Sequence, residues 1–126
     1  MIIRQSNTFL RSFTWTFGTG KGFDSGLLGV YNTPLELQQG DIIQNSSIYS
    51  IVSVVGGPTL DLQDAGGNSL GLPATLLNPF ATNSCTVFAF FSSVSVIVSG
   101  FMKLQIFGAP ITAGSFRIDL EIYRQY

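Results

Sequence analysis

The sequence contains no histidine, a single cysteine and few charged residues. Charged residues make up 10% of the 126 residues, against about 25% in a typical soluble domain. Without histidine, neither histidine-based acid–base catalysis nor histidine metal ligation is available. One cysteine can form neither an internal disulfide nor a cysteine cluster for zinc. Six basic and seven acidic residues also exclude the strong positive field of a general nucleic-acid-binding protein.

Apolar runs long enough to cross a membrane are missing as well. No charge occurs between Asp64 and Lys103, and this stretch contains the apolar residues 86–99. These residues fall short of the roughly 20 that a spanning helix needs, and serines alternate with β-branched residues in their second half. The first residues also lack a basic segment followed by an apolar core. We therefore expect no membrane insertion and no cleaved signal peptide.

What the sequence does contain is short apolar runs of period two, separated by glycine and proline. Hydrophobic residues make up 45% of the chain, which has 14 glycines and a mean hydropathy of +0.37. This pattern predicts an all-β fold, an antiparallel, jelly-roll-like β-sandwich of about eight short strands. We expect one domain over residues 1–126. Its residues 1–34 form either an N-terminal arm or an extra strand followed by a glycine-rich loop.

The alternation also predicts which side chains face the core. In the last strand, four apolar residues point one way, namely Phe116, Ile118, Leu120 and Ile122, and the intervening Arg117, Asp119, Glu121 and Tyr123 point the other. In a first strand over residues 9–17, Phe13, Trp15 and Phe17 share one face. Residues 48–55 are apolar on both faces, which favours a central strand.

Turn residues set the predicted strand boundaries. Pro34 limits where a strand near residues 35–37 can begin. The glycine pair within residues 64–68 predicts a hairpin between residues 59–63 and 69–72. A long connection follows, with room for a short helical turn at residues 74–77. After this connection, strands are expected at residues 85–91, 94–99 and 102–107. A further strand is expected before the hairpin, at residues 42–43.

Three groups of residues resemble chemical sites but fit structural roles better. The glycine-rich residues 18–22 lack the spacing of a phosphate-binding loop. Asp61, Asp64 and Asn68 could surround calcium, but the EF-hand spacing is missing. Asp64 and Asn68 fit a turn, and Asp61 an exposed position. Cys85 has no base nearby and is expected to be a buried thiol.

The remaining candidates are carboxylates, aromatic residues and an acceptor sequence for glycosylation. Asp119 and Glu121 share a strand face with Arg117, so we expect a surface ion-pair row there. Trp15, Tyr31 and Tyr49 are candidates for a sugar-binding surface, although Trp15 fits core packing better. Asn45 begins an Asn-Ser-Ser sequon. We assign no catalytic, cofactor-binding or metal-binding residue and expect no cofactor.

The stretch from Leu37 to Tyr123 resembles a group of small phage virion proteins. The resemblance rests on three pieces: Gly40-Asp41-Ile42-Ile43, residues 54–60 with the Gly56-Gly57 pair, and residues 110–118, which turn into the alternating last strand. It implies a β-sandwich that decorates capsids or forms spikes, fibres or collars.

The resemblance and the low charge together predict a non-enzymatic virion structural protein, acting in capsid decoration, at a vertex or spike, or in a fibre base. We expect it to be located in the virion and to contact other virion proteins and copies of itself. A soluble monomer normally carries more charge, and the resemblance implies a homotrimer. The alternative is a carbohydrate- or receptor-binding module that recognises a host-surface glycan. No nucleic-acid partner is expected.

Overall fold

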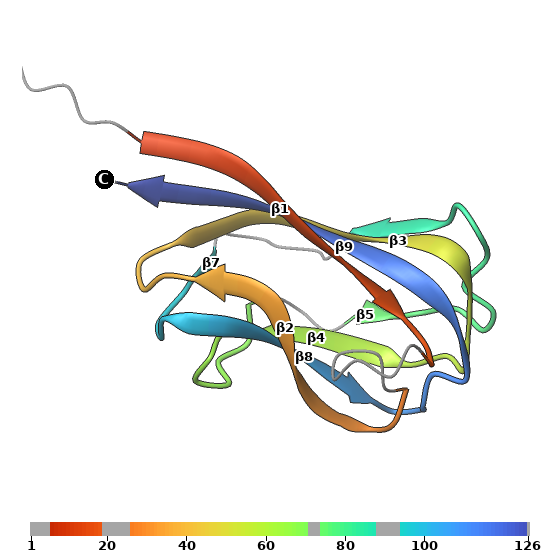
Figure 1. Ribbon diagram of the computed structural model, residues 1–126. Coiled ribbons are helices and arrows are strands. Elements are labelled where there is room, and N and C mark those ends of the chain that lie inside the picture. The colour runs from red at the N-terminus through yellow and green to blue at the C-terminus, as the bar shows by residue number, and fades with distance from the viewer. Residues whose placement is uncertain (1–5, 19–25, 71–73, 88–93, 126) are drawn as a thin grey trace, which may run out of the picture.

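Two antiparallel β-sheets face each other in the computed structural model, which describes residues 6–18, 26–70, 74–87 and 94–125 (Figure 1). The first sheet has the order β1-β9-β3-β6, with β7 also paired to β3. Its strands are β1 (Ser6–Thr16), β3 (Ile42–Val55), β6 (Cys85–Val87), β7 (Val94–Ser95) and β9 (Ala113–Gln125). The second sheet has the order β2-β8-β4-β5. Its strands are β2 (Gly29–Leu37), β4 (Thr59–Gln63), β5 (Ala74–Thr75) and β8 (Gly100–Phe107).

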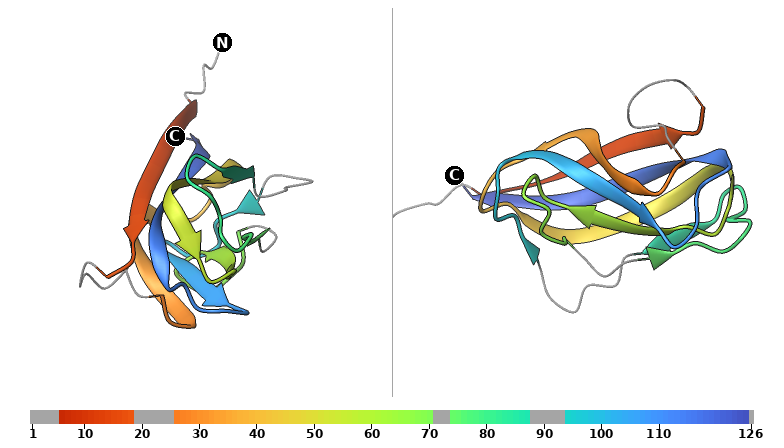
Figure 2. Two further views of the ribbon diagram at one scale, coloured as in Figure 1. Left: turned by 90° about the vertical axis from the view of Figure 1, so that its right-hand side faces the viewer. Right: turned by 90° about the horizontal axis from the view of Figure 1, so that it is seen from below.

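The chain wraps between the sheets in the manner of a jelly roll. It crosses from one sheet to the other at most connections, and stays within one sheet only from β4 to β5 and from β6 to β7. Strands β6 and β7 pair with different parts of the same strand, β3, and together fill one edge position of the first sheet. Each sheet therefore has four strand positions. Figure 2 shows the two facing sheets from the end and from below. The prediction of an all-β, jelly-roll-like sandwich is confirmed.

The core lies between the sheets, and β9 contributes the row of side chains that its alternation predicts. Phe116, Ile118, Leu120 and Ile122 are all buried, whereas the intervening side chains lie on the outer surface. A shift of one residue would bury Arg117, Asp119 and Glu121 instead, at the cost of desolvating their charges. The burial of charge therefore fixes the register of this strand.

The first strand follows its prediction only in part. Phe13 and Trp15 are buried, and the Trp15 ring stacks on Phe116 with centroids 6.1 Å apart. Phe17 lies beyond the end of β1 and is exposed, so its predicted place in the core is wrong. Period-two alternation stops applying where the chain leaves the sheet.

Pro34 lies inside β2 and not at its start, contrary to expectation. The pairing of β2 with β8 is irregular between Asn32 and Glu36, so β2 bulges around the proline. The Thr33 hydroxyl compensates for backbone hydrogen bonds lost between β2 and β8 at the bulge, because it donates to the Met102 carbonyl at 2.8 Å. Since β2 is an edge strand, its unpaired side tolerates a residue without an N–H.

Strand β3 is longer than expected and is covered on one face only. Residues 42–43 and 48–55 belong to one continuous strand with irregularities in its pairing to β9. Its central position is confirmed, because β9 lies on one side and β6 and β7 on the other. However, Ile51, Val52 and Val55 are exposed, so apolar residues here do not mark a second buried face.

Three local predictions between residues 59 and 99 are wrong in part. In the described part of the return limb, residues 69–70, a single bridge joins Ser69 to Gln63, because β4 pairs with β8 and β5 instead. Residues 71–72 of this limb lie outside the described residues. Within residues 74–77, expected to hold a helical turn, residues 74–75 form strand β5 and residues 76–77 are not helical. Strand β7 ends at Ser95, and the following residues turn toward Asp64. Residues 88–91 of the predicted strand 85–91 lie outside the described residues.

Candidate interaction surfaces

One end of the sandwich carries no charge among its described residues. This uncharged end comprises the connections at residues 17–18 and 26–28, 56–58, 76–84 and 108–112, with the adjoining residues 51–55 of β3. It lies at the right in Figure 1 and faces the reader on the left of Figure 2. Seven of the twelve exposed large apolar side chains among the described residues lie in these segments, namely Phe17, Leu27, Leu28, Ile51, Val52, Val55 and Leu77. Exposed apolar side chains at an end without charge are typical of an interaction surface.

Backbone hydrogen bonds tie the loops of the uncharged end together. Phe17 donates to Gly114 at 3.1 Å, Ile111 to Gly26 at 2.8 Å, and Leu76 to Pro58 at 2.9 Å. Two of these bonds join different connections and the third joins a connection to β9, so the apolar side chains sit on a preorganised frame. A preorganised surface loses little conformational entropy on binding.

Two glycines allow these loops to approach each other. A Cβ atom on Gly26 would lie 1.8 Å from the Ile111 carbonyl oxygen, and one on Gly56 would lie 2.0 Å from that of Pro110. Gly56 also has a φ of +128°, a backbone conformation that residues other than glycine rarely adopt. The glycine content of the sequence thus serves close packing at this end.

The opposite end is held by two buried carboxylates. Asp41 accepts two hydrogen bonds from the Arg124 guanidinium, both at 2.7 Å. Asp64 accepts from the backbone N–H groups of Gly66, Asn68, Ile97 and Val98 at 2.9–3.2 Å. Asp64 therefore joins the loop after β4 to the segment after β7. Its predicted role in the turn is confirmed.

The environment of Asp64 favours its charged form. Burial by itself raises the pKa of the carboxyl, but the hydrogen bonds from Asn68, Ile97 and Val98 lower it more, so the pKa lies below the ordinary value of 3.8. Asp61, expected on an exposed face, is instead buried and accepts a hydrogen bond from the Ser69 hydroxyl at 2.9 Å. The described residues contain no group of three or more His, Cys, Asp or Glu side chains that could hold a metal ion.

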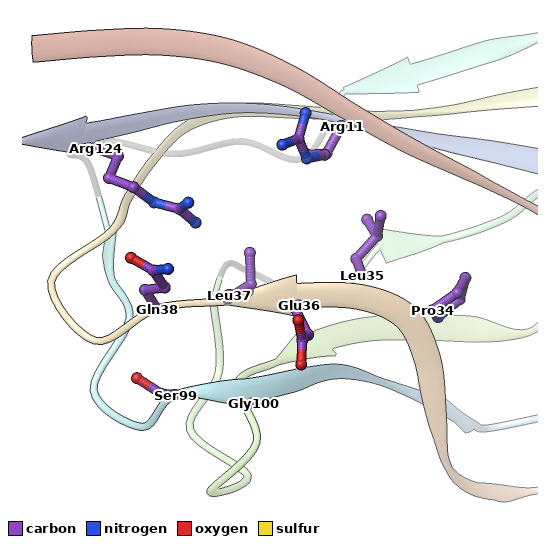
Figure 3. Close-up of a pocket in the computed structure, with 9 residues that line it drawn as sticks. All are labelled: Arg11, Pro34, Leu35, Glu36, Leu37, Gln38, Ser99, Gly100 and Arg124. Atoms are coloured by element: carbon purple, nitrogen blue, oxygen red, sulfur yellow. The ribbon is translucent and has the colours of Figure 1, made fainter.

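A pocket of about 650 Å³ opens beside the edge strands β1 and β2 (Figure 3). Its wall includes Arg11 of β1, Arg124 of β9, residues 34–37 of β2 and the following Gln38. Both guanidinium groups lie over the ring of Phe9, at 4.6 Å for Arg11 and 4.9 Å for Arg124. No sequence motif indicated this pocket, because its residues come from strands far apart in the chain.

The three aromatic candidates do not form a common sugar-binding surface. Trp15 is fully buried, with Tyr31 edge-on to its ring at 5.6 Å. Tyr49 lies on the outer face of the first sheet, where Arg117 covers its ring at 5.1 Å. The exposed Asn45 of the sequon lies on β3.

Two further predictions have different outcomes. The row of charges on β9 includes the expected surface ion pair, because the Arg117 Nε atom lies 2.9 Å from Asp119. Cys85, expected to be buried, is exposed on β6 at the edge of the first sheet.

Of the glycine-rich residues 18–22, only Gly18 lies within the described residues. Within the described part of the chain, no helix is long and apolar enough to cross a membrane.

Comparison with known proteins identifies the fold. No protein-family model and no curated protein sequence matches the chain. The acidic stable capsid structure of Helicobacter pylori bacteriophage KHP30 contains a similar chain, with a TM-score of 0.61 and 13% identity over 97% of this chain and 94% of that chain. The capsid asymmetric unit of cyanophage Pam1 contains another, with a TM-score of 0.59 and 16% identity over 95% of this chain and 85% of that one. The predicted resemblance to phage virion proteins is thus confirmed at the level of the fold.

Proposed function

We propose that this chain is a non-enzymatic structural subunit of a phage particle, and that it works by assembling with copies of itself and with other virion proteins. The observation that carries the proposal is the uncharged end. It combines exposed apolar side chains, absence of charge in its described residues and a hydrogen-bonded frame. The buried centres of protein interfaces are likewise depleted of charge.

The fold supports the same function. Both similar chains, from KHP30 and Pam1, belong to capsids and match this chain over most of its length. The proposed location is therefore the virion, in the shell, at a vertex or in a spike. Identical subunits usually associate with closed symmetry, and the sequence resemblance favours three copies.

The test compares two substitutions that each introduce a lysine into the purified chain. Leu77 is 77% exposed at the uncharged end, and Ile97 is 59% exposed at the opposite end. Leu77→Lys should weaken self-association by about tenfold or more, because the ammonium group must be desolvated in the interface. Ile97→Lys is the matched control and should leave association unchanged.

Sedimentation velocity over a range of concentrations gives the association constant and the number of copies, and electron microscopy shows any closed particles. A chain that remains monomeric at high concentration, and that joins no capsid or tail component, would overturn the proposal. Cross-linking within purified particles would then identify the neighbours and so distinguish shell, vertex and spike positions.

A further inference from the structure

The pocket beside β1 and β2 carries a positive charge that has no carboxylate partner in the described structure. Among the described residues, ion pairs form only between Arg124 and Asp41 and between Arg117 and Asp119. Arg11 is exposed, and its guanidinium contacts the Phe9 ring and the Leu10 carbonyl. Glu36 also lines the pocket, but its carboxylate points away from both guanidinium groups (Figure 3). The pocket therefore presents one uncompensated guanidinium.

A carboxylate is the ligand that this arrangement fits. The planar guanidinium of arginine binds a carboxylate through two parallel hydrogen bonds. Its stacking on Phe9 restricts where the Arg11 side chain can move, so less entropy is lost on binding. A nucleic-acid backbone fits less well, because a polyanion needs a row of cations and Arg124 is already neutralised by Asp41.

Among the described residues, one carboxylate is suitable, that of Glu121. The other described acidic side chains are occupied or unsuitable. Asp41 and Asp119 are in ion pairs, Asp61 and Asp64 are buried and hydrogen-bonded, and Glu36 belongs to the pocket wall. Glu121 lies partly exposed on the outer face of the first sheet. There it lines a shallow depression of about 340 Å³ together with Leu10, whose side chain is 72% exposed.

We propose that the Arg11 pocket of one copy binds the Glu121 carboxylate of a second copy. This inference rests on the self-association proposed above and adds a second, polar contact to it. Arg11 lies in a pocket at the strand edges and Glu121 on the outer face of a sheet, so the two contact surfaces are different. Such a contact either is reciprocal in a two-fold dimer or repeats from copy to copy in a ring or an open chain.

Neutralising and reversing the charges tests this contact. Arg11→Gln and Glu121→Gln should each weaken self-association by about tenfold, because each leaves its partner unpaired in the interface. The matched control Lys103→Gln removes an equal charge from β8, outside both contact surfaces, and should have no effect. The charge exchange Arg11→Glu with Glu121→Arg should recover most of the lost affinity. Thermal unfolding of each variant confirms that it is folded.

Each other outcome has a defined meaning. If Arg11→Gln weakens association but Glu121→Gln does not, Glu121 is not the ligand. A charge exchange that stays as weak as the single variants also overturns the pairing, and so does single-stranded DNA binding that is lost in Arg11→Gln. If Leu77→Lys disrupts assembly while both neutralised variants assemble normally, only this contact is refuted. A wild-type chain that does not associate contradicts the proposed function as well.

Discussion

Replacing Asp64 should destabilise the end of the sandwich opposite the uncharged end. Its carboxylate accepts hydrogen bonds from four backbone N–H groups in two separate segments, as well as from the Asn68 side chain. Asp64→Ala removes all of these acceptors at once. Asp64→Asn keeps one oxygen but places an amide N–H₂ group among donors.

The magnitude follows from the hydrogen bonds. A bond to a charged acceptor contributes about 1.5–3 kcal/mol when buried. The donor residues Gly66, Asn68, Ile97 and Val98 are exposed, so water can replace part of the loss. With about 1 kcal/mol for each backbone donor, Asp64→Ala should lower the free energy of unfolding by about 4 kcal/mol and Asp64→Asn by about half of that.

The effect should depend on pH in a defined direction. The pKa of Asp64 is lower in the folded state than its ordinary value of 3.8, because hydrogen bonds from Asn68, Ile97 and Val98 outweigh the effect of burial. Its carboxylate therefore contributes stability above the unfolded pKa, and this contribution is lost as the pH falls through the folded pKa. The difference between wild type and Asp64→Asn should shrink below pH 3.8.

Urea unfolding at neutral and acidic pH measures both effects. Asp119→Asn serves as the control, because its exposed ion pair should contribute less than about 1 kcal/mol. If Asp64→Asn cost no more than Asp119→Asn at neutral pH, the assignment of Asp64 as the link between the two segments would be refuted.

Two further predictions concern stability and use matched pairs. Ile118→Ala should lower the free energy of unfolding by about 2–5 kcal/mol in chemical unfolding, because Ile118 is fully buried. Asp119→Ala should lower it by less than about 1 kcal/mol. Equal losses would mean that the register of β9 is misassigned. The Ser46 hydroxyl is buried without a hydrogen-bond partner among the described residues, whereas that of Ser50 donates to the Phe80 carbonyl at 3.0 Å. Ser46→Ala should therefore raise the melting temperature or leave it unchanged, and Ser50→Ala should cost about 1 kcal/mol; a loss in Ser46→Ala would point to a missed partner.

The sequence predicts best where burial and charge alternate strictly. On β9, charged residues separate Phe116, Ile118, Leu120 and Ile122, so only one register avoids burying charge. The apolar residues of β3 carry no such signal, because Ile51 and Val52 can face a core or a partner equally well. Cys85 shows the same ambiguity, since an apolar neighbourhood in sequence does not make a strand edge buried.

The sequence predicts that the protein associates, but it does not predict which surfaces take part. The low charge of the chain indicates association, and the structure places seven of the twelve exposed large apolar side chains of the described residues at one end. The pocket could not be predicted, because Arg11, Glu36 and Arg124 come together only when β1, β2 and β9 adopt their places in the two sheets. Likewise, Asp64 resembled a turn residue, and its bonds to Ile97 and Val98 depend on the tertiary fold.

The pairing of β1 with β9 determines when this protein can fold during its synthesis. Ser6 lies opposite Gln125 and Thr16 opposite Ser115, and β2 likewise has β8 as its sheet partner. The first two strands therefore leave the ribosome with no sheet to join until the last two have been made. Long-range pairing of this kind folds slowly and leaves apolar strands open to aggregation meanwhile. The uncharged end also needs the turn between β8 and β9, so a truncated chain cannot present it to a growing particle.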